Sequence, residues 1–217
     1  REMATQAQIQ ALQAQINPHF LFNCLNLLNS LIRTDAESAR QLMQKLATVF
    51  RYTLDSTCKE LVSLQEEIDF VKNYLEIAKA RFGERLSISI AVSPETTTLP
   101  VLPMLLQPLV ENSLHHAIEP KVGNAKLAVS ASIQDNKLKI EVVDDGVGID
   151  SKELTRLQNG LLLTPTSSHT RLSLKNISER LRINYDCDLK IESQQGHGTN
   201  VTILIDLKKL KYKEKSL

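Results

Sequence analysis

Residues 126–149 read KLAVSASIQDNKLKIEVVDDGVGI, and this stretch decides the fold class of the chain. Two runs within it, Lys126–Ile133 and Lys137–Val143, have the composition of β-strands. Asp135 and Asn136 lie between the runs and suit a tight turn, so the stretch predicts a β-hairpin.

The segments on either side of this hairpin mix helices with further strands. The Ser- and Thr-rich segment Asn159–Thr170 lacks periodicity and is predicted to be a mobile loop. Because the helices and hairpins do not form regular βαβ units, the pattern favours an α+β fold, an α/β sandwich with one helical face. Strands are predicted over Leu86–Val92, Leu189–Ser193 and Asn200–Leu207, and helices over Met104–Ile118 and Leu172–Tyr185.

The first 82 residues differ from the rest in composition. All seven glycines lie at or beyond Gly83, and Pro18 is the one proline before Pro94. Glycine and proline interrupt helices, so this half is predicted to be mostly helical. We place a domain boundary near Phe82–Arg85, with a first domain over residues 1–83 and a second over 84–217.

Apolar residues at helical spacing predict three helices in the first half. The first covers Ile9 to Ile32, the second runs from an N-cap at Thr34 or Asp35 to Leu54, and the third covers Leu64–Arg81. Such a helical hairpin buries little core alone, so dimerisation into a four-helix bundle is expected. A coiled-coil spacer is the alternative.

Length and composition exclude several classes of protein. The chain has 217 residues, of which 42% are hydrophobic and 24% charged, which is too apolar for disorder. No apolar run is long enough to cross a bilayer. A net charge of +1 argues against nucleic-acid binding through bulk electrostatics. The three cysteines share no ligand-like spacing, which argues against a disulfide framework or a zinc site.

Two polar motifs in the second half are candidates for a binding site. Asp144 ends a predicted strand and is followed by Gly146 and Gly148, so a carboxylate could bind a ligand that the backbone approaches closely. Glu111 and Asn112 offer the oxygen ligands that Mg²⁺ prefers, with His115 one helical turn further on. Each has a structural alternative: a strand-ending turn in the first case and an exposed polar helix face in the second.

A third motif lies in the first predicted helix, where Pro18 and His19 are followed by the apolar Phe20-Leu21-Phe22 and then Asn23. Pro18 removes a backbone donor and is expected to kink the helix. His19 is mostly neutral near neutral pH and could act as a nucleophile, with Asn23 on the same face. A structural histidine is the alternative.

Together the motifs resemble those of the LytS/YehU-type sensor histidine kinases, in order and over nearly the whole chain. The matching stretches are Asn17–Asn23, Gln107–Asn112, Asp144–Ile149, Asn176–Leu181 and Gly196–Thr199. The resemblance implies a dimerisation and phosphoacceptor hairpin, followed by an ATP-binding domain of the GHKL superfamily.

By this resemblance, His19 is the phosphorylated histidine and Asn112 the magnesium-binding asparagine. Glu111 is a candidate for polarising the nucleophile, since Phe20 stands where many histidine kinases carry an acidic residue. Asn23 is a candidate for aligning a water in the reverse reaction. The resemblance assigns a further set to the nucleotide, with Asp144 as the acceptor from the adenine amino group: His115, Asp144, Gly146, Gly148, Arg171, Asn176, Gly198 and Thr199.

The chain departs from the family pattern at two places. Arg171 and Ser173 replace glycines that border the ATP lid, so Arg171 could either block the phosphates or bind them through its guanidinium. Asp145 stands where asparagine is commoner, and a second carboxylate near a nucleotide repels it unless Mg²⁺ or a base compensates.

The resemblance also implies partners and a location. We expect ATP and Mg²⁺ as cofactors, a homodimer, a response regulator of the LytTR type, and no direct contact with nucleic acid. The chain begins at Arg1 and reads as the cytoplasmic kinase core of a bacterial inner-membrane protein whose N-terminal sensor region is missing. The Lys-rich segment Lys208–Lys215 reads as a solvated tail, with contact to anionic lipid as the alternative. The alternatives are a degenerate kinase acting as a dimeric signalling scaffold and an ATPase of the chaperone or mismatch-repair type.

Overall fold

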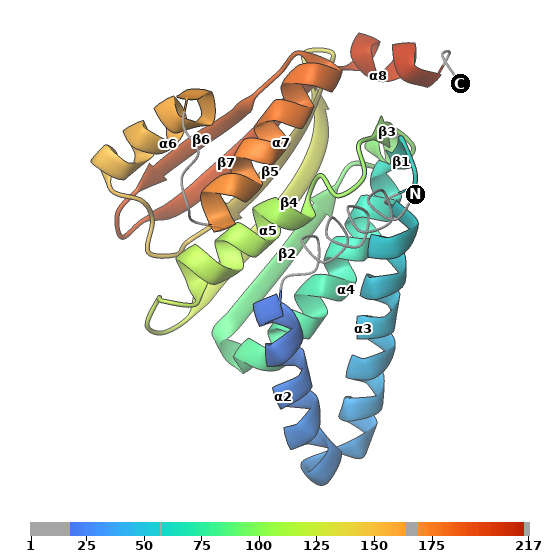
Figure 1. The fold of residues 1–217 in the computed structure, drawn as a ribbon, viewed down its shortest axis with the longest axis vertical. Helices are drawn as coiled ribbons and strands as arrows, with labels where there is room; N and C mark the ends of the chain where they lie inside the picture. The colour runs from blue at the N-terminus through green and yellow to red at the C-terminus, as the bar shows by residue number, and fades with distance from the viewer. Residues whose placement is uncertain (1–17, 57, 164–168, 215–217) are drawn as a thin grey trace, which may run out of the picture.

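The structure is a computed structural model that describes residues 18–56, 58–163 and 169–214. Helices and a five-stranded sheet form the molecule, with a long helical hairpin projecting below the sheet in the view of Figure 1. Of the helix predicted over Ile9–Ile32, the part from Pro18 onward is helical, and the residues before the kink expected at Pro18 lie outside the described part. Among the helices that the structure describes, none is both long and apolar enough to span a membrane.

Three helices make up the N-terminal part: α2 (Pro18–Thr34), α3 (Ala36–Ser56) and α4 (Leu64–Phe82). Asp35 begins α3, because its carboxylate accepts a hydrogen bond from the Ser38 N–H at 3.0 Å. Ser63 begins α4 in a capping box with Glu66. The predicted second and third helices are therefore confirmed, including Asp35 as the N-cap.

The sheet has the strand order β2-β4-β5-β7-β6, with β2 parallel to β4 and every other pair antiparallel. The predicted hairpin is confirmed: Asp135 and Asn136 both adopt positive φ between β4 and β5. The strands are β2 (Leu86–Val92), β4 (Ala125–Gln134), β5 (Lys137–Asp144), β6 (Leu189–Gln194) and β7 (Gly198–Asp206), while β1 (Val62–Ser63) pairs separately with β3 (Pro100–Val101).

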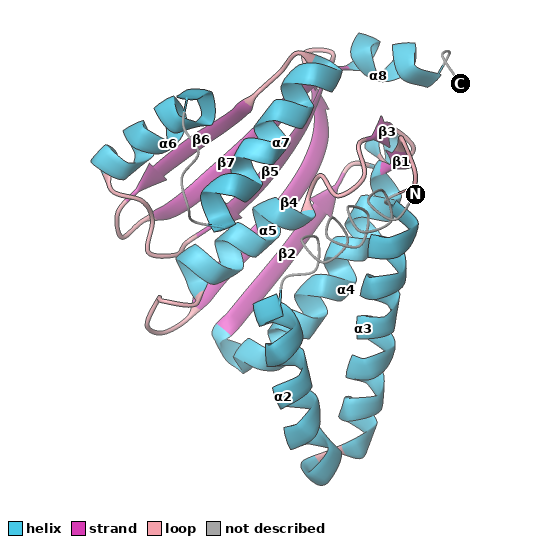
Figure 2. Cartoon of the chain, in the orientation of Figure 1, coloured by secondary structure: helices cyan, strands magenta, loops and turns pink. Residues whose placement is uncertain are grey.

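Helices cover one face of the sheet, as Figure 2 shows. Every second residue of the central strands points to this face and is buried against α7, whose Leu174, Ile177 and Leu181 are buried. The expected α+β sandwich with one helical face is confirmed. The helices after α4 are α5 (Gln107–Asn112), α6 (Ser151–Leu163), α7 (His169–Tyr185) and α8 (Leu207–Glu214), with a π-helical turn, η3 (Ser113–Ile118), and the short helices η1 (Gly83–Arg85) and η2 (Pro94–Thr96).

The structure corrects three sequence predictions. The helix predicted from Met104 begins only at Gln107, because Met104 has a φ of 57° and cannot be part of an α-helix. The loop predicted over 159–170 contains the end of α6 and the start of α7, while residues 164–168 lie outside the described part.

The third correction concerns the C-terminal end. The predicted strand ends at Asp206, and Leu207 begins α8. The segment predicted to be a solvated tail is therefore helical as far as Glu214. Leu210 is buried and Lys209 pairs with Asp186, so one face of α8 packs against the domain.

Candidate active site

Asp144 is the central carboxylate of the site, at the end of β5. It is 4% exposed, and its Oδ1 accepts hydrogen bonds from the N–H groups of Gly146 at 3.0 Å and Thr199 at 3.2 Å. The Ser113 hydroxyl donates a further hydrogen bond to it. Burial raises the pKa of Asp144, and these three donors oppose the rise. Asp144 and Thr199 thus come together as expected, and Ser113 joins them.

The glycines around Asp144 allow backbone segments to touch. A Cβ on Gly146 would lie 2.3 Å from the Ala117 Cβ in η3, and one on Gly198 would lie 2.0 Å from the Asp144 carbonyl oxygen. Gly148 has a φ of 65°, and a Cβ there would lie 2.0 Å from the Gln194 carbonyl oxygen. The fold therefore requires these glycines for internal packing, in addition to the approach to a nucleotide that the sequence predicts.

Asn112 ends α5 and carries a buried amide whose Nδ2 has no hydrogen-bond partner among the described residues. Ser113, the next residue, reaches Asp144, so Asn112 lies beside the end of β5. Within the described ranges, no group of three or more His, Cys, Asp or Glu side chains is placed to hold a metal ion. A magnesium site here would therefore rely on the Asn112 amide and ligands from the nucleotide and water.

Glu111 turns toward the helical part of the molecule. Its carboxylate accepts a hydrogen bond from the Gln107 amide at 2.8 Å and another from the Tyr74 hydroxyl of α4. Burial is the main cause that raises the pKa of Tyr74 well above its ordinary value, and the negative charge of Glu111 adds to it. Tyr74 therefore remains protonated and acts as a donor to Glu111.

The phosphoacceptor-like helix α2 lies against this same tyrosine. The Phe20 ring stacks on the Tyr74 ring, with centroids 4.4 Å apart and planes 18° from parallel. His19 precedes Phe20 in the first turn of α2, and its side chain lies outside the described part of the chain. Tyr74 therefore links two residues: Phe20, which follows His19, and Glu111, which precedes Asn112.

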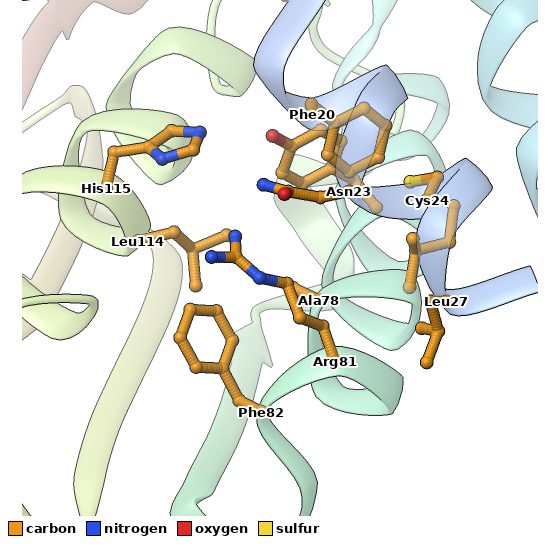
Figure 3. A pocket seen from close by; sticks show the side chains of 11 residues that line it. Phe20, Asn23, Cys24, Leu27, Ala78, Arg81, Phe82, Leu114 and His115 are labelled. Atoms are coloured by element: carbon orange, nitrogen blue, oxygen red, sulfur yellow. The ribbon is translucent and has the colours of Figure 1, made fainter. Parts of the chain in front are cut away.

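A pocket lies between α2, α4 and η3, and Figure 3 shows its lining. Asn23 from α2 and His115 from η3 face it from opposite sides, with Arg81 from α4 below them in that view. His115 Nδ1 lies 2.9 Å from Glu119, which also pairs with Arg81. Burial raises the pKa of Glu119, but the hydrogen bonds from His115 and Arg81 outweigh this and lower it.

Asp145, the second carboxylate of the motif, is paired with a lysine. Lys121 Nζ lies 2.9 Å from its Oδ1, which also accepts from the Lys126 N–H at 2.6 Å. Burial raises the pKa of Asp145, but the hydrogen bonds from Lys121 and Lys126 outweigh it, so the pKa is lowered. Lys121 thus supplies the compensating charge that this second carboxylate requires.

The remaining predicted site residues lie on α7. Arg171 and Ser173 fall in its first turns, and their side chains are outside the described part. Asn176 is exposed on the same helix. Their assignment to the nucleotide remains a prediction.

Sequence reasoning missed four polar residues that organise the site. Ser113 contacts Asp144, and Tyr74 contacts Glu111. Glu67 and Arg180 bind the turn that precedes α5. For Glu67 the sequence does contain an indication, because this charged residue lies among the apolar positions of a predicted helix.

Comparison with known proteins agrees with this geometry. Residues 7–86 match the family model described as "Histidine kinase", and residues 101–209 match the one described as "Histidine kinase-, DNA gyrase B-, and HSP90-like ATPase". The chain belongs to the histidine kinase family. The predicted resemblance to LytS-type kinases is confirmed.

Among curated proteins, this histidine kinase is 38% identical to "Sensor protein LytS" of Bacillus cereus over 204 residues, 93% of this chain and 34% of that protein. It is 34% identical to "Sensor histidine kinase YpdA" of Escherichia coli over 205 residues, 94% of this chain and 35% of that protein. The chain therefore spans about a third of the length of these relatives.

Among solved structures, the fold resembles the histidine kinase domain of the Erythrobacter litoralis EL346 blue-light activated histidine kinase. The TM-score is 0.53 at 18% identity, covering 95% of this chain and 96% of that one. At this identity the likeness concerns the fold alone.

Proposed function

We propose that the chain is the kinase core of a two-component sensor histidine kinase, which transfers the γ-phosphoryl group of ATP to His19 and then to an aspartate of a response regulator. The observation that carries the proposal is the stacking of Phe20 on Tyr74, whose hydroxyl binds Glu111 next to Asn112. These contacts bring the phosphoacceptor helix and the helix of the nucleotide site together in one chain. Residues 1–83 would form the dimerisation and phosphoacceptor domain and residues 84–217 the ATP-binding domain; the matches at 7–86 and 101–209 support this division.

ATP binding follows from the family of the second half of the chain. In this proposal Asp144 accepts a hydrogen bond from the adenine amino group, and Thr199 supports that contact. Gly146, Gly148 and Gly198 shape the backbone around the base, while His115, Arg171 and Asn176 act nearer the phosphates.

Asn112 fits a magnesium ligand. Its buried amide has a polar atom without a partner among the described residues, and the amide oxygen is a hard ligand of the kind that Mg²⁺ takes. Which end of the amide faces the metal is an assignment, since its oxygen and nitrogen exchange places on rotation by half a turn. Bound Mg²⁺ would neutralise charge on the phosphates during transfer.

In the reaction, a ring nitrogen of His19 forms the bond to the γ-phosphorus while the bond to the β,γ-bridging oxygen breaks, which releases ADP. Glu111 is the proposed group that polarises His19 or accepts its proton. Its carboxylate is already oriented by Tyr74 and Gln107, so it needs no reorganisation to act. Asn23, which faces the pocket one turn after His19, would align a water for dephosphorylation of the regulator.

The proposed partners extend beyond this chain. Apolar side chains left exposed on α2 and α3 support a homodimer through a four-helix bundle. A LytTR-type response regulator, a membrane-bound sensor region upstream of α2 and a location on the cytoplasmic side of a bacterial inner membrane rest on the family resemblance of the motifs and are proposals.

The test is incubation with γ-labelled ATP and Mg²⁺ of the natural chain and the variants His19→Gln and Arg171→Gly. We expect acid-labile, base-stable label on the natural chain and none on His19→Gln. His116→Gln is the matched control, because His116 is exposed on η3 outside the proposed machinery, and it should keep the label.

Two other outcomes would change the conclusion. Label on Arg171→Gly but not on the natural chain would mean that Arg171 disables the lid boundary of an otherwise competent kinase. No label on any variant, with no nucleotide binding by calorimetry, would overturn the proposal in favour of a signalling scaffold.

A further inference from the structure

A strained turn precedes the helix that carries Glu111 and Asn112. It comprises Pro103–Leu106, and Met104 within it has a φ of 57°. A left-handed conformation is unfavourable for a residue with a side chain and persists only where the surroundings hold it. Something outside the turn must therefore stabilise it.

The carboxylate of Glu67 in α4 binds the backbone N–H groups of this turn. Its Oε1 accepts from the Met104 N–H at 2.7 Å, and its Oε2 accepts from those of Leu105 at 2.8 Å and Leu106 at 2.9 Å. Successive N–H groups around a left-handed residue form a concave anion site, here filled by a side chain of the same chain. Glu67 is 0% exposed, so water cannot replace these bonds.

The guanidinium of Arg180 in α7 binds the backbone carbonyl groups of the same turn. Its guanidinium donates to the oxygens of Pro103 and Met104. Glu67 and Arg180 therefore act on one turn from two helices, and Figure 1 shows the turn passing between α7 and the α3–α4 pair. We call Glu67, Arg180 and residues 103–106 the turn clamp.

The clamp also reaches the helical hairpin. The Tyr52 hydroxyl of α3 donates to the Glu67 carboxylate, and its ring lies 4.8 Å from that of Phe70. Glu67 thus receives four hydrogen bonds from two separate parts of the chain. Burial raises its pKa, and these four donors favour the ionised form.

We propose that Glu67 is a positioning residue that fixes Asn112 for magnesium and nucleotide by holding the Met104 turn, and that Tyr52 makes this hold depend on the packing of α3. The inference rests on the proposed role of Asn112. Movement of α3 would loosen the Tyr52 contact and, through Glu67, the start of α5.

The test compares two residues at position 104 in a Glu67→Gln background. Glutamine replaces one carboxylate oxygen with an NH₂ group, which cannot accept from the turn. Glycine adopts the left-handed conformation at no steric cost because it has no Cβ. Alanine also removes the long side chain but keeps the Cβ and its steric cost. Met104→Gly should therefore rescue Glu67→Gln, and Met104→Ala should not.

The primary measurement is the affinity for ATP by calorimetry, with and without Mg²⁺, at a temperature where every variant is folded. Glu67→Gln should weaken Mg²⁺-dependent binding about ten-fold, as expected for loss of one hydrogen bond to a charged group. The double variant with Met104→Gly should regain most of this loss. Tyr52→Phe, which keeps the ring, should show a smaller loss of the same kind.

Thr96→Val is the control for a purely structural effect. It removes the hydrogen bond that a fully buried threonine donates to the Ser93 carbonyl oxygen, outside the turn clamp. This variant should lower the melting temperature and leave Mg²⁺-dependent affinity unchanged. If Glu67→Gln behaves in the same way, or if Met104→Ala rescues as well as Met104→Gly, the proposal is wrong.

Amide hydrogen exchange over residues 104–112 separates this inference from the proposed function. Faster exchange in Glu67→Gln, reversed by Met104→Gly, supports the clamp even if the natural chain takes no phosphoryl label. Unchanged exchange overturns the clamp even if the natural chain is an active kinase.

Discussion

Single residues in this protein are constrained mostly by their immediate partners. Asp145 differs from the asparagine common in its family, yet the structure gives it Lys121 and the Lys126 N–H as partners. Gly148 is required because the carbonyl of Gln194 occupies the space of its Cβ. Both are local requirements that a substitution can test directly.

We expect Asp145→Asn to lower stability by less than about 1 kcal/mol near neutral pH, because the pair with Lys121 is partly exposed. The pKa of Asp145 is lowered in the folded protein, so its contribution is present above the unfolded pKa of about 4 and is lost as the pH falls through the folded value. Urea unfolding of both proteins between about pH 7 and pH 3 measures this. A difference that grows toward acid would contradict the assignment.

The two glycines Gly148 and Gly123 form a matched pair. Both have positive φ, but a Cβ on Gly123 meets nothing within 4 Å. Gly123→Ala should cost about 1 kcal/mol from conformation alone. Gly148→Ala should cost more than about 3 kcal/mol, because the backbone at Gln194 must move. Equal losses in denaturant unfolding would show that the close contact at Gly148 is not a constraint.

At the scale of elements, the site depends on how α2, α4 and α5 meet. Each helix is predicted by its own periodicity, but their contact includes one aromatic pair and one hydroxyl that no periodicity indicates. Tyr74 makes both contacts, since its ring stacks on Phe20 and its hydroxyl binds Glu111. The two contributions can be separated by substitution.

Tyr74→Phe keeps the ring and removes the hydroxyl bond to Glu111. We expect it to slow autophosphorylation about ten-fold, since a carboxylate loses an oriented donor, while ATP affinity stays within about two-fold. Phe20→Leu removes the stacking and keeps the hydroxyl. Rapid-quench measurement of the labelling rate in both variants separates the effect of the hydroxyl from that of the ring stacking. An unchanged rate in Tyr74→Phe would rule out a role for the Glu111 contact.

At the scale of the whole molecule, two helices carry apolar side chains that the single chain does not cover. On α2, Phe22 is 66% exposed, Leu25 49% and Ile32 59%, and their spacings of three and seven residues place them on one face of the helix. On α3, Met43 and Leu54 are likewise exposed. Two stripes of this kind on an antiparallel pair are what a four-helix bundle buries on dimerisation.

We therefore expect the chain to be a dimer that Phe22→Glu converts to a monomer, because a charge in a bundle core is unfavourable. Light scattering after size-exclusion chromatography gives the mass. Val122→Glu is the control, as Val122 is 96% exposed and belongs to the loop between η3 and β4, not to either helix. A Phe22→Glu variant that remains dimeric would place the interface elsewhere.

Much of the fold follows from local patterns in the amino-acid sequence. Strand pairing in the β4–β5 hairpin follows from the Asp135–Asn136 turn, and α3 and α4 follow from apolar spacing and their caps. These are local effects, in which side-chain period and turn chemistry act within a few residues. The order of the motifs was enough to indicate the family.

The way the site is held depends on contacts between segments that are far apart in the sequence. Met104 is an ordinary residue by pattern and was predicted to be helical, yet it is left-handed because Glu67, 37 residues earlier, accepts its N–H. Arg180 reaches the same turn from 76 residues further along the chain. A buried charge and a strained turn stabilise each other only when folding brings them together, and no local preference of either segment encodes that contact.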